Sequence, residues 1–264
     1  MPDPSSSIDL PVSAVVLAAG KGSRMGSNLP KVLHEVGGRA MIHHVLNAGR
    51  AAGVTRFVVV VGHEADRVRA ELAGQQDVEF VDQTEQLGTG HAAAMAAPLF
   101  ADAAESTDLI VLCGDMPLTR AETLTALLTE HRRTDAAATL GTAVLPDPNG
   151  YGRIVRDADG SFDRIVEQKD AGEATLAIRE VNPSLYAFKA RALFQELEKL
   201  SSDNAQGEYY LTDVPGQLKA RGERVALMAD LAPEEVIGIN TKEHLAEVDA
   251  IFRSRASSPT GAPQ

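Results

Sequence analysis

Cysteine and tryptophan are nearly missing from this sequence. Its 264 residues include one cysteine, Cys113, and no tryptophan, and aromatic residues make up 4%. A single cysteine excludes an intrachain disulfide and any zinc or iron–sulfur site built from several cysteines. We therefore expect a protein of a reducing compartment and predict the cytoplasm.

Positive charge is also scarce. The chain has 25 Lys and Arg against 37 Asp and Glu, a formal net charge of −12. Nucleic acids and anionic membranes bind to basic protein surfaces, so we expect neither as a partner. Small phosphorylated molecules are still possible ligands where the few cations lie close together.

Long apolar runs are absent as well. No stretch approaches the roughly 20 apolar residues that span a bilayer. The first residues are polar and acidic, whereas a signal peptide begins with basic residues and an apolar core. Residues 1–11 and 253–264 are rich in Pro and Ser and have little to bury, so we predict two disordered tails around one folded domain, residues 12–252.

Short apolar segments alternate with helical patterns in the first half of the chain. Strands without polar alternation are typical of sheets buried on both faces. Strand–helix alternation predicts an α/β fold with a doubly wound, mostly parallel sheet, Rossmann-like in its winding. The expected strands are 12–17, 57–61, 78–81 and 109–113, and the expected helices are 40–52, 64–73, 90–100 and 120–132.

The pattern changes after Ala136. Two alternating segments around a turn at residues 157–160 predict a β-hairpin. No linker-like composition separates the halves, so we predict one domain with a first part of about 12–135 and an inserted β-rich lobe of about 136–240. The expected hairpin strands are 151–156 and 162–168, followed by strands at 178–188 and 236–239 and helices at 191–200, 210–220 and 242–252.

A glycine loop, residues 18–26, follows the first predicted strand, at the edge where open α/β sheets bind ligands. Met25 stands where the dinucleotide fingerprint and the P-loop each require a glycine, so both motifs are excluded. What remains is a turn that can hold phosphate with its N–H groups, together with the cations Lys21, Arg24 and Lys31. A solvated turn with surface cations is the plainer alternative.

The sequence contains five short motifs: residues 17–25 with 29–31, 86–92, 150–155, 165–170 and 204–213. These motifs resemble those of the sugar-nucleotide pyrophosphorylase family. The first alone indicates the superfamily, whereas together they resemble the bacterial uridylyltransferases that act on N-acetylglucosamine-1-phosphate, from about residue 13 to 252. The resemblance implies Mg²⁺-dependent synthesis of UDP-N-acetylglucosamine, a peptidoglycan precursor, and pyrophosphate from UTP and the sugar phosphate.

The resemblance also implies roles for individual residues. Arg24 and Lys31 would be catalytic, stabilising the triphosphate and the departing pyrophosphate, and Asp115 and Asn240 would hold Mg²⁺. The first part of the domain would bind the nucleotide through Leu17, Ala18, Ala19, Gly20, Gln83, Gln86, Gly88, Thr89 and Gly114. The β-rich lobe would bind the sugar through Gly152, Glu167, Asn182 and Asn240.

These residue types suit the chemistry. Joining two polyanions requires positioning and charge neutralisation rather than a protein nucleophile. Mg²⁺ prefers oxygen ligands and phosphates, and amide groups suit a base edge or an acetamide. Helix capping by Asp115 and Asn240, and ordinary loop roles for the other polar residues, are the plainer alternatives.

The sequence departs from the family pattern in three ways. Cys113 stands where tyrosine is expected, and Pro183-Ser184 where Thr-Gly is expected. The reaction class is therefore better indicated than the sugar, and a nucleotidyltransferase of other specificity or a non-catalytic sugar-nucleotide sensor are the alternatives. After Asn240 the sequence has no repeats typical of the β-helix that transfers acetyl groups in two-domain relatives, so we expect a monofunctional monomer or weak dimer.

Overall fold

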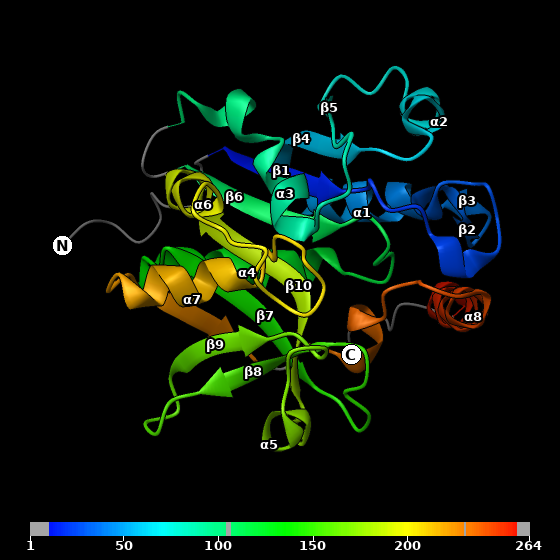
Figure 1. Cartoon of the computed structure of the whole chain (residues 1–264). Helices are drawn as coiled ribbons and strands as arrows, with labels where there is room; N and C mark the ends of the chain where they lie inside the picture. The colour runs from blue at the N-terminus through cyan, green and yellow to red at the C-terminus, as the bar shows by residue number, and fades with distance from the viewer. Residues whose placement is uncertain (1–10, 104–106, 230, 258–264) are drawn as a thin grey trace, which may run out of the picture.

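A nine-stranded mixed sheet forms the centre of the computed structural model, which describes residues 11–103, 107–229 and 231–257 (Figure 1). Strands β8 and β9 branch from β10. The remaining strand order is β11 (Val225–Met228), β7 (Ala138–Val144), β10 (Glu180–Lys189), β6 (Asp108–Cys113), β1 (Val12–Leu17), β4 (Val54–Val61) and β5 (Val78–Asp82).

The first part of the chain forms the parallel region. Strand β1 pairs in parallel with both β4 and β6, and β4 pairs in parallel with β5. Parallel neighbours require crossover connections. Helix α1 (Met41–Ala51) lies in the connection from β1 to β4, α2 (Ala65–Glu71) in that from β4 to β5, and α3 (Thr89–Ala94) in the return from β5 to β6, beside β1. Helix α4 (Ala121–Thr134) leads from β6 to β7. The predicted α/β fold with a mostly parallel, doubly wound sheet is confirmed.

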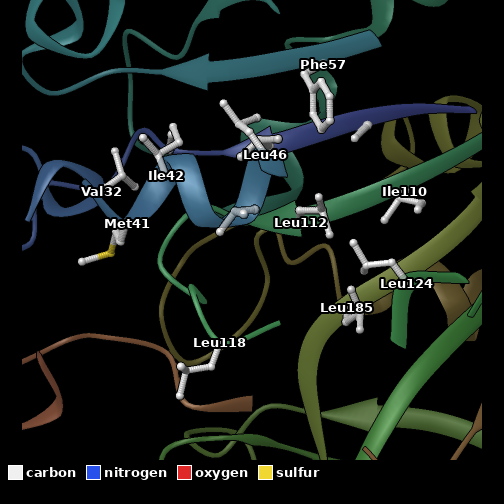
Figure 2. Packing of buried hydrophobic residues seen from close by; sticks show 14 of the residues in the cluster. Val32, Met41, Ile42, Leu46, Phe57, Ile110, Leu112, Leu118, Leu124 and Leu185 are labelled. Carbon is white, nitrogen blue, oxygen red and sulfur yellow. The ribbon is translucent and has the colours of Figure 1, made fainter. Parts of the chain in front are cut away.

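Apolar side chains from this region hold the sheet edge in place. Leu46 of α1, Phe57 of β4 and Leu112 of β6 pack in one buried cluster, and Val32 extends the cluster toward the glycine loop (Figure 2). Each large side chain that is fully buried contributes about 1.5–3 kcal/mol relative to exposure. The loops that follow β1 and β6 are therefore carried by a rigid base.

The second part of the chain completes the same sheet with antiparallel strands. Strand β10 runs antiparallel to both β6 and β7, and the predicted hairpin is present as β8 (Gly152–Arg156) and β9 (Phe162–Val166). Strands β7 and β11 are additional to the predicted elements. Gly141 in β7 gives little hydrophobic signal, and the Leu231 side chain packs directly on it, since a Cβ there would lie 2.9 Å from a Leu231 methyl carbon.

Three predicted elements need correction. The helix expected at 90–100 breaks into α3 and a 3₁₀ turn, Ala97–Phe100, because Pro98 offers no N–H for a helical hydrogen bond. The strand expected at 236–239 is a 3₁₀ turn, Pro233–Val236, followed by irregular backbone whose Ile239 N–H donates to the Asp115 carbonyl at 3.0 Å. Helix α8 (Lys242–Ser257) continues five residues into the tail expected at 253–264.

Short elements connect these parts of the sheet. The elements not yet named are the 3₁₀ turns η2 (Ser23–Met25) and η3 (Lys31–Leu33), β2 (Glu35–Val36), β3 (Arg39–Ala40), α5 (Glu173–Leu176), α6 (Ala190–Leu197) and α7 (Asp213–Ala220).

Of the helices in the described ranges, none has both the length and the apolar character needed to cross a membrane. Residues 1–10 and 258–264 of the two predicted tails lie outside the described residues.

Candidate active site

The carboxyl ends of β1 and β6 lie side by side in the centre of the sheet. Their register pairs Leu17 with Cys113, so the loops after both strands begin at the same level. The chain leaves β1 toward β4 on one side and β6 lies on the other, which makes this edge a topological switch point. Gly114, directly after β6, allows the chain to pass close to the end of β1, because a Cβ at Gly114 would lie 3.1 Å from the Leu17 carbonyl oxygen.

A cavity of about 290 Å³ opens at this edge, and we call it the glycine-loop cavity. Every predicted nucleotide contact except Gly114 lines it. Gly114 lies behind the wall, where its N–H donates to the Leu17 carbonyl at 3.0 Å. The lining residues are Leu17, Ala18, Ala19, Gly20, Lys31, Val32, Gln83, Gln86, Gly88, Thr89, Ala92, Cys113, Asp115 and Glu208.

Backbone geometry shapes the far wall of this cavity. Gly88 has φ +115°, a conformation essentially restricted to glycine, and a Cβ there would lie 2.6 Å from the Tyr209 carbonyl oxygen. The buried Gln83 donates from Nε2 to the Gly88 carbonyl at 3.0 Å, and Gln86 donates to the Ala19 carbonyl at 2.8 Å. In this state both glutamine amides brace the loops that form the wall.

A second cavity of about 260 Å³ lies against the β8–β9 hairpin, and we call it the hairpin cavity. It is lined by every predicted sugar contact. Cys113 and Asp115 line both cavities, so the two meet at the end of β6. The lining residues are Arg24, Cys113, Asp115, Met116, Asn149, Gly150, Tyr151, Gly152, Glu167, Asn182, Pro183, Ser184, Val236, Gly238, Asn240 and His244.

Four charged or polar side chains meet at the junction of the cavities. Lys31 bonds through Nζ to the Asp115 carboxylate, and it also donates to Asn240 Oδ1 at 3.1 Å. Arg24 donates to the same Asn240 oxygen at 3.0 Å. These four residues come from segments up to 216 positions apart, and the fold brings all of the predicted catalytic and metal residues together.

The glycine loop presents its cations through local backbone geometry. Arg24 lies in the 3₁₀ turn η2, which is flanked by Gly22 (φ +61°) and Gly26 (φ +58°) in the left-handed region that favours glycine. Met25, next to Arg24, is fully buried and anchors the turn. Lys31 begins the 3₁₀ turn η3, whose Val32 and Leu33 are buried.

The hairpin cavity contains a largely buried carboxyl group. Thr212 donates from Oγ1 to Glu167 Oε1 at 2.9 Å. Burial raises the pKa of Glu167, nearby carboxylates add to this effect, and the Thr212 hydrogen bond opposes it. A ligand hydroxyl that donates to Glu167 would stabilise the charged form in the same way as Thr212 does.

Asn182 is 3% exposed and is held by its own strand. Its Nδ2 donates to the Tyr186 hydroxyl at 2.7 Å, and its Oδ1 accepts from the Ser184 N–H at 3.3 Å. The β7–β10 register shifts between Val181 and Leu185, where Pro183 cannot donate to the ladder. Asn182 therefore lines the cavity as part of an irregular strand segment.

The departures from the family pattern lie together in the structure. The Cys113 thiol is 3.8 Å from the Ser184 carbonyl, and both residues line the hairpin cavity with Pro183. Burial, with the nearby Asp115 carboxylate, raises the pKa of Cys113 to about 12, so the thiol is neutral near pH 7. Ser184 has φ +65°, the left-handed conformation that the expected glycine would adopt freely.

Among the cavity residues that were not predicted contacts, Tyr151, Glu208 and His244 carry groups that could bind a ligand. Tyr151 donates to the Val236 carbonyl at 3.0 Å, and Glu208 lines the glycine-loop cavity. Both belong to motifs recognised in the sequence, so their proximity to the site was a usable signal. His244 lies 3.2 Å from the Gly238 carbonyl in the first turn of α8, and the sequence offers no comparable signal for it.

The donor set at the junction suits a hard cation. In the part of the chain that the structure describes, His, Cys, Asp and Glu form no group of three or more that could hold a metal. Asp115 and Asn240 instead present two oxygens that already share one cation, the Lys31 ammonium. Two protein oxygens with further positions for water and phosphate are typical of Mg²⁺.

Comparisons with known proteins agree with this architecture. The family model described as "MobA-like NTP transferase domain" matches residues 14–217. A protein named "Bifunctional protein GlmU" from Brevibacillus brevis is 51% identical over 244 residues, 92% of this chain and 52% of the relative. Its namesake from Lactococcus lactis subsp. lactis is 47% identical with the same coverage. The chain thus spans about half the length of the curated relatives it matches.

A solved structure supports the fold. A putative glucose-1-phosphate thymidylyltransferase from Bacillus anthracis, in complex with a sucrose, superposes with a TM-score of 0.75. The alignment covers 95% of this chain and 98% of that one. Sequence identity is 18%, so this likeness concerns the fold alone.

Proposed function

The chain belongs to the family of MobA-like NTP transferase domains, and from that premise we propose that it transfers a uridylyl group from UTP to N-acetylglucosamine-1-phosphate. The products would be UDP-N-acetylglucosamine and pyrophosphate. One observation carries the proposal: two cavities meet at Asp115, and the cations Arg24 and Lys31 lie at that junction. The similarity to the proteins named "Bifunctional protein GlmU", at 47–51% identity, supports the proposal.

The reaction would take place at the junction. An oxygen of the sugar phosphate attacks the α-phosphorus of UTP, and the bond from that phosphorus to the bridging oxygen of the β-phosphate breaks. The electron pair leaves with pyrophosphate. Both reactants are polyanions, so the barrier depends on alignment and on cations placed where negative charge develops. Arg24 and Lys31 are positioned to supply that charge.

We assign the divalent cation to Asp115 and Asn240. The carboxylate and the amide oxygen would hold Mg²⁺, which when bound would neutralise charge on the two phosphate groups. Arg24, on the same Asn240 oxygen, would keep the amide oriented. Family membership supports a divalent ion, and the oxygen-only donor pair supports Mg²⁺ in particular.

The nucleotide would occupy the glycine-loop cavity. Backbone groups of residues 17–20 and the loop around Gly88 would contact the base and ribose, and Gln83, Gln86 and Thr89 would offer amide and hydroxyl groups to the base edge. Gly114 contributes by packing, because a Cβ there would also lie 3.0 Å from Val32.

The sugar would occupy the hairpin cavity. Glu167 would accept hydrogen bonds from sugar hydroxyls, and Asn182 with its Tyr186 and Ser184 partners would face the acetamide. Gly152 packs closely on the hairpin, since a Cβ at position 152 would lie 3.0 Å from the Ile165 side chain and in van der Waals contact with the Glu167 carboxylate. With a net charge of −12, the protein would act on small molecules in the cytoplasm rather than on nucleic acid.

A second sugar is the alternative that a specific observation favours. Cys113, Pro183 and Ser184 replace the expected family residues at adjacent positions of the hairpin cavity. A sugar lacking the N-acetyl group would then be the preferred substrate, with the same transfer chemistry.

A pyrophosphate-release panel tests both candidates. Four nucleoside triphosphates would be combined with N-acetylglucosamine-1-phosphate, glucosamine-1-phosphate and glucose-1-phosphate in the presence of Mg²⁺. We expect the highest kcat/KM for UTP with N-acetylglucosamine-1-phosphate. A higher value with glucosamine-1-phosphate or glucose-1-phosphate would support the alternative, and no release from any pair would refute both.

A further inference from the structure

Lys31 lies between the two oxygens that we assign to the divalent cation. Its ammonium bonds to the Asp115 carboxylate and lies 3.1 Å from Asn240 Oδ1. The Lys31 and Asp115 side chains are 17% and 16% exposed, so the pair is partly shielded from water. Because the ammonium contacts both oxygens that the divalent cation would take as ligands, the two cations compete for the same position.

We infer that Lys31 is a placeholder for the metal: it holds Asp115 and Asn240 in their ligand arrangement, and the arriving divalent cation displaces its ammonium toward the phosphates. This inference rests on the proposed function for the identity of the metal and the phosphates. It adds that metal binding and the release of Lys31 for phosphate binding are one coupled event.

The surroundings allow only part of Lys31 to move. The backbone at Gly22 packs on the lysine stem, since a Cβ at Gly22 would lie 2.9 Å from Lys31 Cβ. The adjacent residues Val32 and Leu33 are buried and fix the backbone. The lysine also lines the glycine-loop cavity, into which the outer methylene groups and the ammonium can rotate.

The second cation at Asn240 makes the exchange specific to Lys31. Arg24 donates to the same amide oxygen at 3.0 Å and, within the part of the chain that the structure describes, forms no hydrogen bond or ion pair with Asp115. Displacing Lys31 therefore leaves Asn240 oriented by Arg24 while both Asp115 and Asn240 gain a divalent partner. The two cations would have separate tasks before the substrates arrive.

Metal binding without substrates tests the inference. Lys31→Met removes the ammonium and keeps a long apolar side chain, so Mn²⁺ should bind the substrate-free variant about 10- to 100-fold more tightly than wild type. Electron paramagnetic resonance measures free Mn²⁺, and Mg²⁺ competition confirms a shared site. Lys242→Met is the matched control, because it removes an exposed charge two residues from Asn240 and should change the affinity less than about threefold.

A measurement on the wild-type protein is independent of whether Lys31→Met folds. The NMR signal of the Lys31 ammonium, identified by its loss in the variant or by selective labelling, should shift or broaden when Mg²⁺ saturates the site. An unchanged signal at saturation, or an unchanged Mn²⁺ affinity in folded Lys31→Met, would overturn the inference. Tighter Mn²⁺ binding in Lys31→Met, together with a wild-type protein that releases no pyrophosphate from any substrate pair, would refute the proposed function and support the exchange.

Discussion

The two cavities at the sheet edge differ in how far backbone and side chains form their walls. The glycine-loop cavity depends on the backbone of its wall, because Gly88 lies where a side chain would clash with the Tyr209 carbonyl and Gly114 packs closely behind the wall. The hairpin cavity is walled by side chains such as Glu167 and Asn182, carried on antiparallel strands. A backbone wall restricts the sequence to few residue types, whereas a side-chain wall can change its chemistry while the strands keep their register.

The junction at Asp115 is shared by both cavities, so a substitution there should lower turnover more than a substitution in either wall. Asp115→Asn keeps the size of the side chain but removes the charge that faces Lys31 and, by our proposal, the metal. We expect turnover to fall at least about 10³-fold at saturating Mg²⁺, with an unchanged circular dichroism spectrum. Exposed Asp66→Asn is the control, and activity within tenfold of wild type for Asp115→Asn would exclude the metal role.

A change in the backbone wall should come next. Gly88→Ala forces a Cβ to within 2.6 Å of the Tyr209 carbonyl, so the loop must shift and the nucleotide with it. We expect kcat/KM for UTP to fall about 10²-fold and the free energy of unfolding to fall by about 1–3 kcal/mol. Gly172→Ala is the control, because it has φ −75° and open space around its Cα. Normal UTP kinetics in Gly88→Ala would show that the backbone at Gly88 does not position the nucleotide.

A change in the side-chain wall should weaken binding of the sugar phosphate and leave binding of the nucleotide unchanged. Glu167→Gln should raise KM for the sugar phosphate about 5- to 100-fold, because a ligand hydroxyl loses a charged acceptor, while KM for UTP changes less than threefold. Exposed Glu173→Gln serves as control. Equal effects on both Michaelis constants would show that the two cavities are not separate binding sites.

The raised pKa of Glu167 predicts a pH-dependent contribution of this side chain to stability, which can be measured. Since its folded-state pKa lies above the unfolded value, the burial of Glu167 favours the folded state below the unfolded pKa, and that advantage is lost as pH rises through the folded pKa. Because glutamine does not ionise, the free energy of unfolding of Glu167→Gln should increase relative to that of wild type as the pH is raised from about 4 to 7, as measured by thermal unfolding. A pH-independent difference would contradict this assignment.

The smallest effect is expected where the side-chain wall carries a strained backbone. Ser184→Gly relieves a left-handed conformation worth about 1 kcal/mol, and the added freedom of the unfolded chain opposes the gain. The free energy of unfolding should change by less than about 1 kcal/mol in urea titrations. Ser184→Ala keeps the Cβ and loses the hydroxyl, so it separates backbone strain from hydrogen bonding. If the free energy of unfolding fell by more than about 2 kcal/mol in Ser184→Gly and not in Ser184→Ala, the expected offset between strain relief and chain entropy would be wrong.

The sequence predicted the parts of the molecule that depend on local pattern. The parallel strands and the hairpin are continuous segments with their own periodicity, and the glycine loop combines turn residues with cations in a short stretch. Strand β7 and the segment after η5 were misjudged because their state depends on partners far away, such as Leu231 against Gly141 and the Asp115 carbonyl for Ile239.

The same distinction applies to the site. Motif resemblance placed Arg24, Lys31, Asp115 and Asn240 in one site, and the fold brings them within hydrogen-bond distance, although their roles are still predictions. The contact between Cys113 and Ser184 joins positions 71 residues apart, and the sequence marked each only as a separate departure. No pattern along the chain encodes such a pair.

The placement of β10 has a consequence for the synthesis of the chain. This strand, Glu180–Lys189, covers the edge of β6, whose residues Asp108–Leu112 are buried in the finished sheet. A nascent chain that has emerged only to about residue 135 can complete the parallel region, yet it presents β6 as an apolar open edge. Such edges pair readily with other chains. The parallel region is thus most exposed to aggregation during the interval in which the ribosome adds the next fifty or so residues, and β10 is the strand that ends it.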